Sequence, residues 1–68
     1  MDIKVLVGKR VRELRNRIGI SQEELADKAC LDRTYITSVE CGKRNISIVN
    51  IERIAIALGV TLAEFFTF

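Results

Sequence analysis

The sequence lacks proline and histidine altogether and has only two cysteines among its 68 residues. The absence of proline disfavours a turn-rich β-sandwich and favours helices. The absence of histidine removes the most frequent general base and the most frequent metal ligand. Glu23 and Glu24 are adjacent, so on a helix they point about 100° apart and make no catalytic pair. We therefore expect no enzymatic activity, no cofactor and no metal site.

Cys30 and Cys41 are too few to form the disulfide framework of a small secreted domain. No CxxC pair or histidine is present to complete a zinc site. We expect both cysteines to be free thiols in a reducing compartment. A redox switch that uses Cys30 and Cys41 is the alternative.

Long hydrophobic runs are also missing. The longest apolar stretch, residues 54–58, is far shorter than the roughly 18–20 residues that a membrane span needs. The apolar run near the N-terminus is too short for a signal peptide. These features predict a cytoplasmic protein with no membrane partner.

Charge is modest in total, at +2, but uneven along the chain. Residues 1–17 and 28–44 are basic, whereas residues 18–27 carry only acidic charges. The two basic segments can fold into one positive face, but an ordinary solvated surface would look the same. Charge alone does not distinguish a nucleic-acid partner from none.

Apolar spacing and capping residues predict an all-α chain. Ile3, Val7, Val11, Leu14 and Ile18 form one stripe of an amphipathic helix. Further on, serine or threonine precedes two helices as the start of a capping box, and glycine follows three helices at their ends. The expected helices cover residues 2–18, 22–29, 33–41, 48–58 and 62–67 of a single domain spanning residues 1–68.

Residues 21–42 carry the most informative pattern. Two short helices are separated by only three residues, 30–32, so the second must cross the first at a steep angle. Ala26 is small enough for the backbones to approach, and Leu31, Ile36 and Val39 supply apolar packing. This stretch resembles the helix-turn-helix of the bacteriophage-repressor-like regulators. The resemblance implies a compact five-helix, lambda-repressor-like DNA-binding domain.

A second resemblance is more specific. The runs LDRTYITSVE at 31–40, GKRN at 42–45 and SIVNI at 47–51 are similar to controller proteins of restriction–modification systems. That likeness implies a transcriptional regulator that binds its own operator. A generic phage-repressor-like regulator or an antitoxin is the first alternative, and a helical interaction module without DNA binding is the second.

The exposed face of the third helix carries side chains suited to reading bases in the major groove. Arginine can bind guanine O6 and N7 together, and threonine can offer its hydroxyl to a base edge and its methyl to thymine. For Ser38 a purely structural role is equally well supported. The expected base-reading residues, with the last implied by the controller resemblance, are Arg33, Thr34, Thr37, Ser38 and Arg44.

Phosphate contacts are expected around this helix, mostly from the resemblance. The family uses a glutamine after the second helix's cap to hold a phosphate, where helix amides add attraction. Tyr35 could instead pack in the core, and Ser47 also caps a helix. The expected phosphate-contacting residues are Gln22, Tyr35, Lys43, Asn45, Ser47 and Asn50.

Two further expectations concern structure. The repressor resemblance implies a partly buried ion pair between Arg15 and Glu40, joining the first helix to the third. Cys30 occupies a turn position where the family often has glycine or asparagine because the backbone is left-handed there. A cysteine at that position carries a penalty of about 1 kcal/mol.

The last two helices have more apolar residues than one small core can bury. A chain of this length buries only about 60% of its unfolded surface, so a second copy would add needed burial. The expected dimer interface comprises Ile48, Ile51, Leu62, Phe65 and Phe66. The expected partners are then an identical chain and a palindromic double-stranded DNA operator with half-sites about 10 bp apart. Two further possibilities are the binding of two dimers to adjacent sites and a contact with RNA polymerase.

Overall fold

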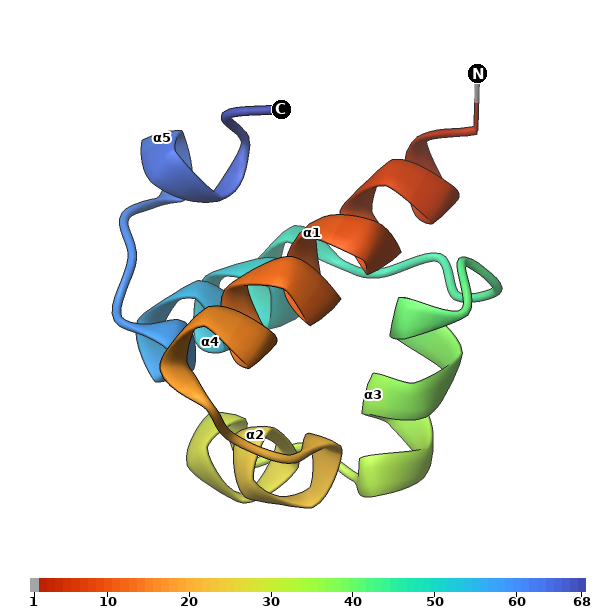
Figure 1. Ribbon diagram of the computed structural model, residues 1–68. Coiled ribbons are helices and arrows are strands. Elements are labelled where there is room, and N and C mark those ends of the chain that lie inside the picture. The colour runs from red at the N-terminus through yellow and green to blue at the C-terminus, as the bar shows by residue number, and fades with distance from the viewer. Residues whose placement is uncertain (1) are drawn as a thin grey trace.

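The computed structural model describes residues 2–68, which contain helices and no strand (Figure 1). The helices are α1 (Ile3–Ile18), α2 (Gln22–Ala29), α3 (Arg33–Glu40), α4 (Ile48–Leu58) and α5 (Leu62–Phe65). The predicted all-α fold is confirmed. The last helix is shorter than the expected span of 62–67, because the chain leaves helical geometry after Phe65.

Local sequence signals account for most helix ends. Ser21 and Thr61 each form a complete capping box with the glutamate three residues later. Ser47 accepts a hydrogen bond from the Asn50 amide in the same way. Asp32 precedes α3 in an extended conformation, but its side chain makes no capping hydrogen bond.

The core lies between α1 and the other helices, with α1 running across the molecule above α2 and in front of α4 in the view of Figure 1. α2 packs against both α3 and α4, and α1 packs mainly against α3. The largest side chains that are fully buried are Phe65, Leu25, Ile36, Ile54 and Val11.

Phe65 is not available to a dimer interface. Its side chain is 0% exposed within the single chain, and Ile51 is also buried at 7%. α5 folds back against α1, where the Arg10 guanidinium donates hydrogen bonds to the carbonyls of Glu64 and Phe65. The expectation that Phe65 forms part of the surface for a second copy is therefore corrected, because burial in the chain's own core explains its apolar character. Ile51 is also buried but still lines a surface groove.

α1 and α3 approach each other closely at Gly8. A Cβ atom on Gly8 would lie 2.3 Å from the carbonyl oxygen of Val39 and 3.0 Å from that of Glu40. Both contacts are with backbone, which cannot move aside without separating the helices. Gly8 thus sets the distance between the first helix and the third.

Cys30 adopts the left-handed conformation expected of it, with φ 57° and ψ 42°. It is the sole non-glycine residue with positive φ among residues 2–68. Its amide donates to the carbonyls of Ala26 and Asp27, which ends α2 and turns the chain toward α3.

Candidate nucleic-acid interface

The α2–α3 unit is built as the sequence pattern indicated. Ala26 is buried, and its carbonyl accepts a hydrogen bond from the amide of Leu31, at 2.9 Å, across the turn. Ile36 and Val39 point into the core from α3. The opposite side of α3 consequently faces solvent, at the right of Figure 1.

A shallow depression of about 280 Å³ lies on that exposed side. Its walls carry hydroxyl groups and two cations, with one thiol. The lining residues are Arg33, Thr34, Thr37, Ser38, Cys41 and Lys43. The structure therefore brings together four of the five expected base-reading residues and one of the expected phosphate-contacting residues.

Arg44, the fifth, lies beside this depression on Tyr35. Its guanidinium carbon is 4.7 Å from the centre of the tyrosine ring, a cation–π distance, and its Nε donates to Ser38 Oγ at 3.3 Å. The Tyr35 hydroxyl accepts a hydrogen bond of 3.1 Å from Asn50 Nδ2. Tyr35 is half-buried, so it both packs on the core and supports the arginine.

The expected ion pair between α1 and α3 is present. Arg15 Nε lies 2.7 Å from Glu40 Oε2 and Arg15 Nη2 lies 3.0 Å from Oε1, a bidentate arrangement. Arg15 Nη1 also donates to the Ile20 carbonyl. Glu40 is only 6% exposed. Burial raises the pKa of Glu40, but hydrogen bonds from Arg15, Gln22 and Arg12 outweigh it and hold that pKa below its ordinary value.

Gln22 has a structural role that the sequence alone did not reveal. Its Nε2 donates to Glu40 Oε1 at 3.1 Å, and its Oε1 accepts from the Thr37 hydroxyl at 3.0 Å. One amide thus joins the buried ion pair to the wall of the depression. The sequence placed Gln22 at the start of α2. Its hydrogen-bond partners on α3 follow from the way the two helices cross, which the sequence does not show directly.

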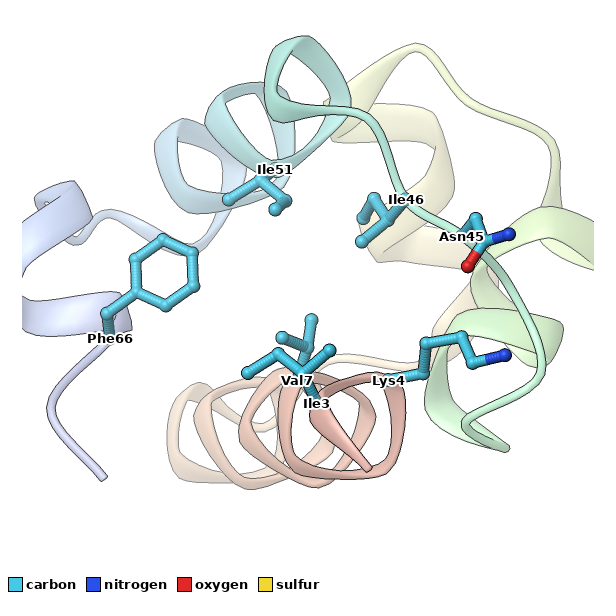
Figure 2. Close-up of a pocket in the computed structure, with 7 residues that line it drawn as sticks. All are labelled: Ile3, Lys4, Val7, Asn45, Ile46, Ile51 and Phe66. Atoms are coloured by element: carbon cyan, nitrogen blue, oxygen red, sulfur yellow. The ribbon is translucent and has the colours of Figure 1, made fainter. Parts of the chain in front are cut away.

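Asn45 and Ser47 are not brought into the depression. Ser47 caps α4, and Asn45 lines a different, mostly apolar groove of about 320 Å³. Figure 2 shows Ile46 and Ile51 facing Ile3 and Val7 across this groove, with Phe66 at one end and Lys4 and Asn45 at the other. Ile48 and Leu62 are exposed. The apolar side chains of the groove, together with Ile48 and Leu62, come from α1, the loop before α4, α4, α5 and the residue that ends α5.

Two negative findings concern residues 2–68. No group of three or more histidine, cysteine, aspartate or glutamate side chains is placed to hold a metal ion in that range. None of the helices described there is long and apolar enough to cross a membrane.

Comparison with known proteins identifies the family. The model of the family described as "Helix-turn-helix" matches residues 11–65. A control protein from Mycoplasma sp., C.MunI, is 48% identical over 67 residues, which are 97% of this chain and 90% of that protein. The chain is a helix-turn-helix protein of the controller group.

Solved structures agree with this assignment. The restriction–modification controller protein C.AhdI from Aeromonas hydrophila superposes with a TM-score of 0.92 at 47% identity, covering 97% of this chain and 100% of that one. The controller C.Esp1396I, solved as a tetramer in complex with its natural 35 base-pair operator, gives a TM-score of 0.91 at 36% identity, covering 97% and 87%. The resemblance to phage-repressor-like and controller proteins is thus confirmed, and α2 and α3 are the helix-turn-helix.

Proposed function

We propose that this helix-turn-helix protein binds double-stranded operator DNA by placing the exposed side of α3 in the major groove, and so regulates transcription. The observation that carries the proposal is the polar depression lined by Arg33, Thr34, Thr37 and Ser38. Its hydroxyl and guanidinium groups have the hydrogen-bonding chemistry that base edges require. Lys43 at the rim and Arg44 beside it supply positive charge toward phosphates.

The proposed active form is a homodimer on a palindromic operator. Ile48, Leu62 and Phe66 offer exposed apolar surface around α4 and α5, which a two-fold interface would bury. Because C.Esp1396I binds its operator as a tetramer, two dimers on adjacent sites are part of the proposal. We further propose the control of a restriction–modification operon in the cytoplasm, with contact to RNA polymerase when the dimer activates, and no catalytic role.

The phosphate contacts proposed for this complex are those of Gln22, Tyr35, Lys43, Asn45, Ser47 and Asn50. Asn50 acts through the Tyr35 hydroxyl, which it holds at 3.1 Å. Asn45 and Ser47 lie on the segment leading into α4. They would contact phosphates of the DNA backbone beyond the depression.

The test is selection of duplexes from a random pool by the wild-type chain, followed by affinity measurements with the selected site. Arg33→Ala should weaken binding to that site by about 1–3 kcal/mol and relax the preference at one base pair. Arg53→Ala is the control, because Arg53 lies on α4 beside Lys28 and Cys30, away from the depression. If no sequence is enriched, or Arg33→Ala leaves both affinity and preference intact, the proposal is wrong.

A further inference from the structure

Arg12 on α1 carries a positive charge that is not required to neutralise the buried carboxylate of Glu40. Its Nε lies 3.5 Å from Glu40 Oε1, a long contact. The same carboxylate already receives two hydrogen bonds from Arg15 and one from Gln22. Because Arg15 neutralises Glu40, the positive charge of Arg12 is surplus, and its side chain is 56% exposed.

The position of Arg12 follows from a shared acceptor. Arg12 Nε and Gln22 Nε2 both approach Glu40 Oε1, at 3.5 and 3.1 Å, so the two donors share one acceptor. The Gln22 amide continues to the Thr37 hydroxyl at 3.0 Å. A short, connected row of side chains therefore runs from the α3 depression across the start of α2 to Arg12 on α1.

This row has the chemistry of a phosphate-facing edge. A helix in the major groove is flanked by phosphates, and a guanidinium fixed beside the groove is well matched to one of them. Glu40 does not repel the phosphate strongly, since it is buried and its charge is paired with Arg15. Its Oε1 instead accepts from both Arg12 and Gln22.

We propose that Arg12 contacts a DNA phosphate beside the groove entered by α3, with Gln22 and Glu40 fixing its position. The inference rests on the proposed function and extends the contact surface from α2 and α3 to α1. Arg12 was not among the contacts expected from the sequence. Its position three residues before Arg15, on the same helix face, was the available signal.

The experiment measures affinity for the wild-type-selected duplex, and for a random duplex, over a tenfold range of salt. Each phosphate contact contributes about 0.9 to the slope of log affinity against log salt. Arg12→Gln should lower that slope by about 0.9 for each bound protomer. The affinity deficit of the variant relative to wild type should then be about eightfold larger per protomer at 0.1 M than at 1 M salt. The loss should be equal on both duplexes, because a phosphate contact does not read sequence.

Arg17→Gln is the matched control. Arg17 is also an exposed arginine of α1, at 61%, but it approaches Glu13, and Glu13 pairs with Arg10 on the side that holds α5. The variant removes the same charge from the other side of α1 and should keep the wild-type slope. Arg12→Lys retains the charge and should restore most of the slope lost in Arg12→Gln.

Thermal unfolding without DNA separates the contact from a structural role. If Arg12 only supported Glu40, Arg12→Gln would lower the melting temperature and leave the salt slope unchanged, which would overturn the inference. Equal slope losses in Arg12→Gln and Arg17→Gln would also overturn it, as a general charge effect. A wild-type chain without salt-dependent binding would instead refute the proposed function itself.

Discussion

The two halves of this chain use their side chains in opposite ways. Between α1 and α3, polar groups are collected in the interior and every one is paired, from the Arg15–Glu40 ion pair to the Gln22 amide. Over residues 2–68, no buried side-chain nitrogen or oxygen lacks a hydrogen-bond partner. Around α4 and α5, by contrast, apolar side chains remain at the surface, including Ile48 at 65% and Phe66 at 41% exposed.

This difference indicates which half is complete within one chain. Buried charges are costly unless paired, so the network between α1 and α3 stabilises only because all its members are present. Exposed apolar area is unfavourable by roughly 25 cal/mol per Å², so the α4–α5 half gains from further burial. The first half is suited to holding a rigid reading surface, and the second to association.

The largest expected effect comes from breaking the paired network. Glu40→Ala removes the partner of Arg15 and leaves a guanidinium that is nearly buried, which should cost about 3–5 kcal/mol of unfolding free energy. In a chain of this size that approaches the whole stability. Chemical denaturation measures the loss, and a decrease below about 1 kcal/mol would mean that the pair contributes little.

The dependence of stability on pH tests the same ion pair independently. Because the pKa of folded Glu40 lies below its ordinary value of 4.5, its stabilisation is present above about pH 4.5 and is lost as pH falls through the folded pKa. Glu40→Gln should therefore lose less stability on acidification than wild type. It should still lose some, since hydrogen bonds in the two capping boxes also lower the pKa values of Glu24 and Glu64.

The association half is tested by charging its surface. Phe66→Asp places a carboxylate at the end of the apolar groove in Figure 2 and should convert dimers to monomers. Sedimentation measures the dimer, and loss of pairing should weaken binding to a palindromic site by at least about tenfold, or 1.4 kcal/mol. The half that contains α3 should stay folded, because Phe66 is exposed and lies outside the buried core.

Ile56→Asp is the companion variant. Ile56 is 71% exposed and lies with Arg53 and Lys28 on the other side of α4. It should remain dimeric. A monomeric Ile56→Asp together with a dimeric Phe66→Asp would move the interface to that outer side and contradict the assignment of the groove.

The smallest effect comes from comparing the two capping boxes. Ser21→Ala and Thr61→Ala each remove one cap, worth about 1 kcal/mol. Ser21→Ala should lower the melting temperature of the whole chain by about 4–8 °C, because α2 packs against α3 and α4. Thr61→Ala should act more on dimer formation, because it loosens the short α5. If the two variants lowered the melting temperature and weakened dimer formation equally, the two halves would unfold and associate as one unit.

The sequence predicted the fold well because its signals are local. Capping boxes, terminal glycines and apolar spacing each act within a few residues, and they located the helices found over residues 2–68. Burial of Phe65 was missed for the opposite reason: a four-residue helix has too little periodicity to show which side faces the core. The closure of α5 depends on Arg10, whose carbonyl partners lie 54 and 55 residues away.

The candidate site was predictable as a set of residues but not as a network. The helix-turn-helix spacing located Arg33, Thr34 and Thr37 on one surface. The bridging role of Gln22 and the proximity of Arg12 arise from helix crossings that sequence spacing does not encode. Gly8 is similar, since its lack of a side chain matters only because the backbone of α3 passes so close.

The hydrogen bond between Thr37 and Gln22 also determines which hydrogen-bonding groups the α3 depression presents to solvent. The Thr37 hydroxyl has one proton, and its acceptors in the folded chain are Gln22 Oε1 and the Arg33 carbonyl, each at 3.0 Å. Ser38 likewise directs its proton to the Tyr35 carbonyl. With their protons engaged inside the protein, both hydroxyls present lone pairs outward. Groups that meet these two hydroxyls without disturbing the fold must bring a donor, such as an exocyclic amine. Donors in return come from other side chains of the depression, such as Arg33 and Lys43.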